Sequence, residues 1–563
     1  MIFHHPEIPC ITLKIGIPIN IGMLFLFTHL SNLPPFQSTY YICSMIETIE
    51  VRMLPGDASD IDAVHRKVIS KCGHKKADIK AMKIRKRSID ARGRKPVVRL
   101  RVDVYINEAY EGEPALLDSF KPLSPKAKKV IIVGAGPAGY FAGLELIALG
   151  LKPIIFDRGK DVRSRRRDLK AIQQFGEVNA DSNYCFGEGG AGTYSDGKLY
   201  TRSGKKGTIG KVLQLLVEHG AKEDILIDAH PHIGSNKLPQ IVANIRNTIE
   251  EYGGEVHFDS KVTNLIIRQD VLQGVVVNEK EEHLADATIL ATGHSARDIY
   301  FLLRDKEIRL EAKPFALGVR VEHPQPLIDE LQYNQRPREK ELPAASYRLA
   351  CQQNGRGVFS FCMCPGGLIV PASTAPGEIV VNGMSLSRRD SPYANSGMVV
   401  AVDETLFQPF KKHKEFAGLE FQKSVEQKMY AAGDGTQAAP AQRMTDFISG
   451  KVSQELKGSS YIPGLLAAPL HELLPKEIYE ALRKGFIHFG KSMKGYLTEE
   501  ANVIGTESRT SSTIRIPRNP KTLMNEQIAA FFPCGEGAGY AGGIVSAAID
   551  GQRVSGQVAS YLA

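Results

Sequence analysis

The sequence of 563 residues has no tryptophan and only eight cysteines. Cysteines this few and this scattered do not build a disulfide framework, and they suit a reducing compartment. We therefore expect a cytoplasmic protein. No uninterrupted apolar run reaches the roughly 18 residues that a membrane-spanning helix needs. No membrane association is expected of the main part of the chain.

Residues 1–44 match no domain pattern. Their apolar stretch, 11–30, is interrupted by Lys14 and Pro18. A basic start and a small-residue cleavage site, the marks of a signal peptide, are missing. We interpret the segment as an extension outside the fold, with a membrane-targeting role as the alternative.

Positive charge is concentrated just after this extension. The formal net charge is +9, yet residues 66–101 hold 15 Lys and Arg against two acids. Residues 45–122 show the patterns of a small β-α-β-β domain. An anionic partner such as RNA, bound mainly through phosphates, is one hypothesis for this domain. A solvated or interdomain face is the alternative, because few aromatic residues interleave the charges. The expected elements are 46–52, 57–72, 79–89 and 97–106.

A nucleotide-binding signature follows. Residues 129–133 form an apolar strand, and Gly134, Gly136 and Gly139 then open a helical pattern. In the GxGxxG motif the first glycine makes a tight turn and the second lets backbone approach a pyrophosphate. The third lets the helix pack on the strand. Asp157 ends the next strand and could accept a ribose hydroxyl. The pattern predicts a dinucleotide at a helix N-terminus, with an ordinary glycine-rich turn as the alternative.

The glycine cluster near the C-terminus bears on which dinucleotide is bound. Gly537, Gly539 and Gly542 have the spacing of a second GxGxxG for NAD(P). Only about 20 residues follow Gly543, which leaves room for one helix and none for a further strand carrying a ribose acid. This favours FAD.

Six motifs together resemble the bacterial FAD-dependent, NAD-utilizing dehydrogenase family, with a glutathione-reductase-like FAD fold. The resemblance runs from about Met45 to the C-terminus. It implies a Rossmann-like, FAD-binding α/β domain and a redox role, and it names no substrate. The motifs are Gly187–Lys198, Ala291–Asp298, Phe361–Gly367, Asn382–Met384, Ser508–Ser512 and Gly535–Gly543.

The resemblance also implies the cofactor-binding residues. Glu536 would bind the ribityl chain, and Val262 would present its backbone to the adenine. The helix near Ile544 would point its N-terminus at the flavin, whose reduced form is negative near N1. Asp157 stands where Glu is usual in this class, so its ribose hydrogen bond would be single or water-mediated. The expected set is Gly134, Gly136, Pro137, Ala138, Gly139, Asp157, Arg158, Gly189, Gly190, Thr193, Ser195, Val262, Ala291, Thr292, Gly293, Gly535, Glu536, Gly542, Gly543 and Ile544.

Residues that would carry the chemistry are less clearly marked. Cys362 and Cys364 could be a redox pair, but a Cys-x-Cys ring is strained, and buried structural cysteines are the alternative. No second pair stands at zinc-ligand spacing, so we predict no metal. Arg320 and Arg509 could clamp an anionic substrate or form interdomain ion pairs. His294 lies near the cofactor or caps the next helix. No general base is assigned.

The predicted architecture is a Rossmann-like FAD domain interrupted by a cap. FAD-binding segments at 127–305 and 528–563 flank an inserted α+β substrate or cap domain at 306–527. We expect an FAD-dependent oxidoreductase, a dehydrogenase that transfers hydride between a small-molecule substrate and flavin. NAD(P)H is a candidate transient electron donor. The alternatives are a flavoprotein that binds or modifies RNA and a non-catalytic flavin-binding scaffold or sensor. Within the cap we expect short strands at 358–362 and 379–381 and helices over 404–432 and 468–486.

Overall fold

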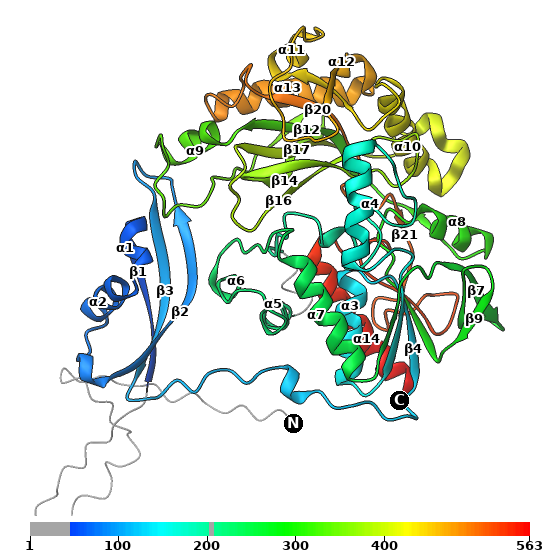
Figure 1. The fold of residues 1–563 in the computed structure, drawn as a ribbon, viewed down its shortest axis with the longest axis horizontal. Coiled ribbons are helices and arrows are strands. Elements are labelled where there is room, and N and C mark those ends of the chain that lie inside the picture. The colour runs from blue at the N-terminus through cyan, green and yellow to red at the C-terminus, as the bar shows by residue number, and fades with distance from the viewer. Residues whose placement is uncertain (1–44, 202–207) are drawn as a thin grey trace, which may run out of the picture.

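A computed structural model describes residues 45–201 and 208–563 (Figure 1). The predicted extension, 1–44, lies outside the described residues. Figure 1 shows three bodies: an N-terminal module, a central α/β domain and a cap domain above it. No helix within the described ranges is long and apolar enough to cross a membrane.

The N-terminal module is a three-stranded antiparallel sheet with two helices on one face. Alternating apolar residues of the strands pack on Val64 and Val68 of the second helix. The prediction of one continuous helix over 57–72 is wrong, because the segment forms two helices that separate at Asp60. Asp60 is extended and caps the second helix, because its carboxylate accepts the amide of Asp62. The elements are β1 (Met45–Met53), α1 (Pro55–Ser59), α2 (Ile61–Cys72), β2 (Ile79–Asp90) and β3 (Val97–Ile106).

The central domain is built on a five-stranded sheet in the order β22-β10-β4-β5-β6, and every pair in it is parallel. Strands covered on both faces read as continuous apolar runs. Accordingly Val130, Ile131 and Ile132 are wholly buried. The strands are β4 (Lys129–Val133), β5 (Lys152–Phe156), β6 (Glu255–His257), β10 (Ala287–Leu290) and β22 (Phe531–Pro533).

Helices cover one face of this sheet and a β-meander covers the other (Figure 1). The third strand of the meander, which is short and polar, was not predicted. The helices of the covered face are α3 (Pro137–Ala148), α5 (Ile209–Glu218), α7 (Leu238–Glu251) and α14 (Ile544–Leu562). The meander is β7 (Val262–Arg268), β8 (Val271–Val277) and β9 (Glu281–Leu284). The remaining helices are α4 (Val162–Phe175), α6 (Asp224–Ile227) and α8 (Arg297–Asp305).

The cap is a seven-stranded sheet in the order β13-β14-β17-β12-β20-β18-β19. Its strands are β12 (Phe315–Pro324), β13 (Ala350–Gln353), β14 (Arg356–Cys364), β17 (Tyr393–Val402), β18 (Ala439–Arg443), β19 (Leu465–Ala467) and β20 (Asn502–Glu507). The hairpin of β15 (Gly367–Pro371) and β16 (Val381–Ser385) forms a separate two-stranded sheet that packs against it. The α-helices of the cap are α9 (Gln325–Tyr333), α10 (Ala417–Ala431), α11 (Met444–Ser449), α12 (Leu470–Leu473) and α13 (Lys476–Ser492).

Three expectations for the cap need correction. The strand expected at 379–381 begins only at Val381. The helix expected over 404–432 is a 3-10 segment, Gln408–Phe416, followed by α10. The helix expected over 468–486 breaks between α12 and α13, where Pro475 ends one and precedes the other.

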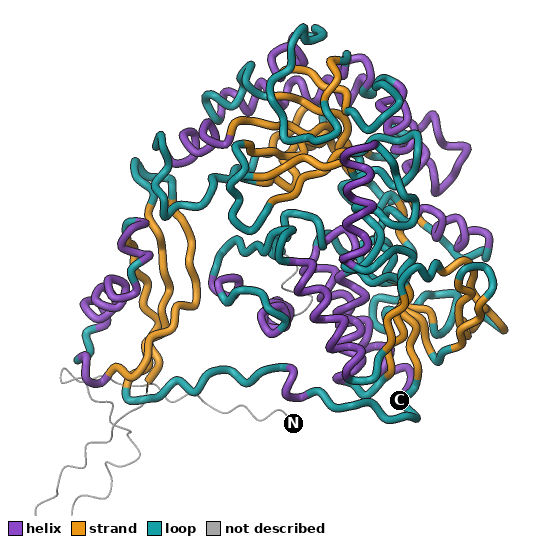
Figure 2. The backbone as a smooth tube through the Cα atoms, viewed as in Figure 1, coloured by secondary structure: helices purple, strands orange, loops and turns teal. Residues whose placement is uncertain are grey.

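The chain returns to the central domain before residue 528. Ile514 and Ile516 pack with Phe531 in a core of the central domain. Arg518 donates hydrogen bonds to Asp550 on α14. Figure 2 shows loops of the two larger domains meeting between their sheets, and the functional site lies there.

Candidate functional site

A pocket of about 330 Å³ lies where the carboxyl ends of β4 and β10 meet the cap. Gly134 and Gly293 line it from the central domain, and Asn382 and Glu507 line it from the cap. Ligands of parallel α/β sheets bind outside the carboxyl ends of the strands, and clefts between domains are common sites. The predicted nucleotide motif and the cap therefore share one cavity.

The three glycines of the GxGxxG motif are required for different physical reasons. A Cβ on Gly134 would lie 2.6 Å from the Ala291 carbonyl oxygen, and one on Gly139 would lie 1.9 Å from the Gly134 oxygen. Protein packing therefore demands these two. A Cβ on Gly136 would meet nothing nearer than 4.0 Å, the Gly190 Cα, and would project into the pocket. Gly136 keeps backbone open to a ligand, as a pyrophosphate site requires.

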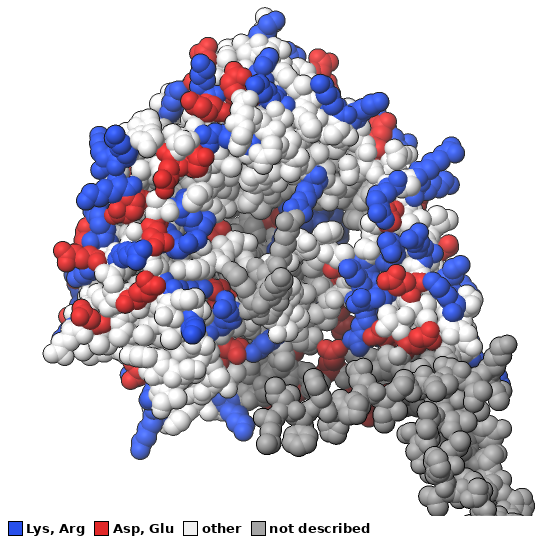
Figure 3. Space-filling model, turned by 180° about the vertical axis from the view of Figure 1, so that it is seen from behind, with Lys and Arg blue, Asp and Glu red and all other residues white. Residues whose placement is uncertain are grey.

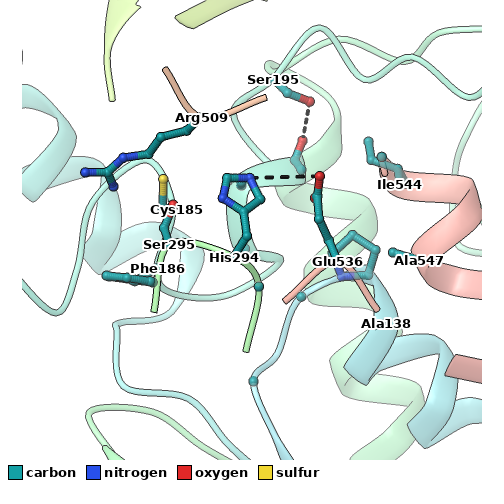
Figure 4. A pocket seen from close by; sticks show the side chains of 18 of the residues that line it. Ala138, Cys185, Phe186, Ser195, His294, Ser295, Arg509, Glu536, Ile544 and Ala547 are labelled. Atoms are coloured by element: carbon teal, nitrogen blue, oxygen red, sulfur yellow. Dashed lines mark hydrogen bonds and ion pairs between the residues drawn. The ribbon is translucent and has the colours of Figure 1, made fainter. Parts of the chain in front are cut away.

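Two helices begin at this pocket. Gly136 precedes α3 and Gly543 precedes α14, and neither helix has a side-chain cap. Figure 4 shows Ala138 of α3 and Ile544 and Ala547 of α14 along one side of the cavity. Uncapped first-turn amides and the positive ends of two helix dipoles favour anionic groups, such as a diphosphate or a reduced flavin.

Asp157 organises the turn rather than standing free. Its carboxylate accepts the amides of Ala135 at 2.8 Å, Gly159 at 2.9 Å and Gly187 at 3.1 Å. A carboxylate has about four acceptor sites, so one remains for a ribose hydroxyl. The segment that begins at Gly187 is also stabilised by Arg165. This side chain is fully buried and donates hydrogen bonds to the carbonyl oxygens of Gly187 and Glu188.

Glu536 and His294 face each other across the pocket (Figure 4). The Glu536 Oε1 and His294 Nε2 atoms are 3.9 Å apart. Burial raises the pKa of Glu536 to about 7, although Lys313 opposes the shift. Burial and the charge of Arg509 lower the pKa of His294 to about 4. At neutral pH the imidazole is neutral, and the carboxyl is poised to donate or accept a hydrogen bond.

Most of the expected cofactor residues line the cavity. Four do not, and they support it instead. Gly139 packs on the turn, and the Gly535 amide donates to Asp550. Thr193 donates to the Glu188 carbonyl oxygen, and a Cβ on Gly189 would strike Thr193. The lining members are Gly134, Gly136, Pro137, Ala138, Asp157, Arg158, Gly190, Ser195, Val262, Ala291, Thr292, Gly293, Glu536, Gly542, Gly543 and Ile544.

The two cysteines also lie at the pocket. Cys362 sits at a bulge of β14 with φ of 44°, and its side chain is exposed to the cavity. Cys364 is buried beside it. Surrounding protein raises the pKa of both thiols, to about 11 for Cys364. Both are therefore protonated at neutral pH, which makes them poor nucleophiles. All six cysteines in the described ranges are unpaired.

Arg509 is committed to a buried ion-pair network that spans the domains. It donates to Glu426 and Glu378, each at about 3 Å, and to Thr374. Arg297 of the central domain donates to the same two carboxylates. These four charges balance. All three guanidinium nitrogens of Arg509 have partners. Of the two roles expected for Arg509, substrate clamp or interdomain ion pair, the structure therefore fits the ion pair.

Arg320 is wholly buried and does not line the pocket. It donates to the Cys362 carbonyl oxygen and lies 3.2 Å from the Glu507 carboxylate. Its contacts are made within the cap sheet.

Several pocket residues were not singled out from sequence. Asp196 and Lys198 lie 3.7 Å apart, and Arg389 donates to Asp196. Three of the missed residues, Asp196, Lys198 and Asn382, lie inside quoted motifs, so the motif was the available signal. The missed members include Cys185, Asp196, Lys198, Asn382 and Glu507. No three potential metal ligands come together within 45–201 and 208–563.

The basic residues of the N-terminal module are partly neutralised. Arg85 pairs with Asp103 and Glu113. Arg87 reaches α6 of the central domain, where it pairs with Asp224 and Asp228. Figure 3 shows Lys and Arg interleaved with acids over the module. Arg87 therefore belongs to a contact between domains, which was the alternative to anion binding. Binding of an anionic partner by the other basic residues of the module stays a prediction. Salt-sensitive binding of tRNA would test it.

These features define a dinucleotide-binding α/β protein with a cap. Residues 314–510 match the family "FAD-dependent protein, C-terminal domain-like", and residues 45–105 match a domain of unknown function. An uncharacterised protein of Clostridium beijerinckii is 40% identical over 517 residues, which cover 88% of this chain and 95% of that protein. The chain belongs to the family of that protein, and its cap is similar to the C-terminal domain of FAD-dependent proteins.

Two solved structures show only a distant likeness. A triple mutant of the flavin-dependent brominase Bmp2 is 13% identical, with a TM-score of 0.35, over 77% of this chain and 79% of its own. A flavocytochrome c3 fumarate reductase in the open conformation is 14% identical, with a TM-score of 0.32, over 78% and 79%. At these TM-scores neither carries an argument about the reaction.

Proposed function

We propose that the protein is a cytoplasmic FAD-dependent dehydrogenase that transfers hydride between a small molecule and flavin. The observation that carries the proposal is the two-walled pocket. One wall presents open backbone at Gly136 and the beginnings of α3 and α14. The other wall, from the cap, carries Cys362, Asn382 and Glu507.

FAD fits the residues that are present. Gly136 leaves space at the cavity, and α3 offers amides to a diphosphate. Asp157 retains acceptor capacity for the ribose, and α14 offers its positive end to the flavin ring. A bound flavin would supply the hydride acceptor. The protein's own part is to hold it, to exclude water and to exchange the substrate proton.

NAD(P)H is proposed as a transient electron partner, in keeping with the resemblance to NAD-utilizing dehydrogenases. The C-terminal glycine cluster joins β22, a strand of the same sheet as β4, to α14, and it lines the same pocket. It is therefore part of the proposed flavin site, and we propose that a nicotinamide donor binds briefly at the flavin face.

The test starts with the absorbance spectrum of purified protein and the mass of the released chromophore. We expect oxidised-flavin absorbance and FAD at about one per chain. Anaerobic NADH and NADPH are then added. A colourless protein that cannot be reconstituted with FAD would overturn the proposal. Bound flavin that neither nucleotide reduces would overturn the nicotinamide partner, and flavin that no donor reduces would favour the scaffold alternative.

A further inference from the structure

Three neighbouring strands of the cap sheet place buried, unpartnered polar atoms next to the pocket. Arg320 on β12, Asn395 on β17 and Glu507 on β20 are each 1% exposed or less. Five of their atoms find no hydrogen-bond partner among the described residues: Arg320 Nε and Nη1, Asn395 Nδ2 and Oδ1, and Glu507 Oε2. Buried polar groups are nearly always hydrogen-bonded. A cluster of exceptions is therefore typical of a site that a ligand completes.

Glu507 is the member of this cluster that lines the pocket. Two glycines, Gly397 on β17 and Gly383 on β16, make room for the pair. A Cβ on Gly397 would lie 3.1 Å from Glu507 Cγ, and one on Gly383 would lie 2.6 Å from Arg320 Nη2. Arg320 Nη1 lies 3.2 Å from Glu507 Oε2, outside hydrogen-bond geometry. The ion pair orients the carboxylate, and Oε2 keeps an unused acceptor site on a residue that lines the cavity.

We propose that Glu507 is the residue that exchanges a proton with the substrate, and that Arg320 positions it. This rests on the proposed function and names the substrate class: a small molecule whose reactive carbon bears a hydroxyl or amino group. A bound flavin would supply the acceptor for the hydride that leaves when the C–H bond of the substrate breaks. Glu507 would take the O–H or N–H proton, and a C=O or C=N bond would form in the substrate. The reverse direction returns both.

The electrostatics of the site suit this role. Burial raises the pKa of Glu507 to about 7, and the charge of Arg320 on β12 opposes the shift. From β14 the facing titratable group is the Cys362 thiol, whose pKa is also raised. On β17 the facing residue is Gly397, which does not titrate. A general base works best when its pKa lies near the working pH.

The test compares two conservative variants of the FAD-loaded protein. Glu507→Gln removes the proton acceptor. Glu322→Gln is the matched control, because Glu322 is also a buried glutamate of the cap sheet with its pKa raised by burial. Its carboxylate is already satisfied by Ser460, and it does not line the pocket. Glu536 is retained in both proteins.

Two readouts need no substrate. The first is the reduced-minus-oxidised infrared spectrum at pH 7, in which Glu507→Gln should lose one component of the protonated-carboxyl band and Glu322→Gln none. The second is the flavin midpoint potential against pH, measured with mediator dyes. Its slope near pH 7 should become shallower in Glu507→Gln alone, because one redox-linked proton is lost.

The outcomes separate the two proposals. A Glu507→Gln protein that matches the wild type in both readouts, with FAD bound, overturns this inference alone. A protein that binds no FAD overturns the proposed function. If Glu507→Gln does not fold, Glu507→Asp keeps a carboxyl on a shorter arm. A shifted band component would support the role, and an unshifted one would contradict it.

Discussion

The two walls of the pocket are built by different means. The central-domain wall exposes backbone at Gly136 and Gly293, beside the side chains of His294 and Glu536, and is ordered by the ends of a parallel sheet. The cap wall presents the side chains of Cys362 and Glu507, held by strands from distant parts of the sequence. A backbone wall suits a shared cofactor, whose diphosphate is recognised by amides. A side-chain wall suits a particular substrate.

The largest expected effect tests the packing of the backbone wall. Gly139→Ala places a methyl group 1.9 Å from the Gly134 oxygen, so backbone must move. We expect a loss of more than about 4 kcal/mol in unfolding free energy, or no folded protein. The measurement is denaturant unfolding followed by circular dichroism. The control is Gly556→Ala on α14, where a Cβ meets nothing within 4 Å; equal losses in both would refute the steric argument.

The next effect tests the side-chain contacts between the cap and the central domain. Glu426→Gln removes one of the two carboxylates that Arg297 and Arg509 share. It leaves uncompensated buried charge, which costs about 3–5 kcal/mol. Thermal unfolding should show the loss. Arg304→Gln, which breaks the exposed pair with Asp305, should change stability by less than about 1 kcal/mol. A small effect at Glu426 would contradict the network.

The third effect concerns the cap wall and is the pH dependence of stability that the buried Glu507 carboxyl causes. The pKa of this carboxyl rises from its ordinary 4.5 to about 7 in the folded protein. Its contribution to stability is therefore present below pH 4.5 and is lost as the pH rises to 7. Relative to Glu507→Gln, the wild type should lose about 1–3 kcal/mol between pH 5 and 8. Melting temperatures at both pH values measure this, with exposed Glu281→Gln as control. A constant difference would contradict the buried titration.

Ligand binding at the backbone wall is tested by Gly136→Ala. The added methyl group meets no protein atom nearer than 4.0 Å and enters the pocket. Stability should change by less than about 0.5 kcal/mol. FAD affinity should fall at least about tenfold, near 1.4 kcal/mol. Reconstitution of the flavin-free protein, followed by flavin fluorescence, measures this. Unchanged affinity would place the diphosphate elsewhere.

The smallest effect concerns the N-terminal module. Arg87→Gln removes its ion pairs with Asp224 at the start of α6 and Asp228 just after its end. The side chain is 39% exposed, so solvent screens the pairs, and the loss should stay below about 1 kcal/mol. Protease cleavage between the module and the central domain should become slightly faster. A large loss of stability would mean that the module is part of the central core.

The same contrast explains what the sequence could predict. The strand at Lys129–Val133 and the glycine turn are local patterns, so residue types at fixed spacing suffice to locate them. Most expected cofactor residues line the pocket for this reason. Arg509 was visible as a candidate, but its partners Glu378 and Glu426 come from other elements, so its ion pairs could not be predicted.

The cap was harder to predict for a physical reason. In its sheet β12 lies between β17 and β20, which come from later and separate parts of the chain. Strand pairing at such separations leaves no local signal. Glu507 directly precedes the quoted segment Ser508–Ser512, yet only pairing with β12 brings it beside Arg320. At Asp60 a local signal was overlooked instead. The apolar spacing of residues 57–72 predicted one continuous helix, but Asp60 is extended and caps α2, which separates it from α1.

The shared arginine–glutamate network determines how the molecule can move. Arg297 belongs to the central domain, while Glu378, Glu426 and Arg509 belong to the cap. Rotation of the cap about a hinge would pull opposite charges apart in a poorly hydrated place, which is costly. The two domains should therefore behave as one rigid body. Cofactor release should then require partial unfolding rather than gate opening, and purified protein should keep its FAD through extensive dialysis.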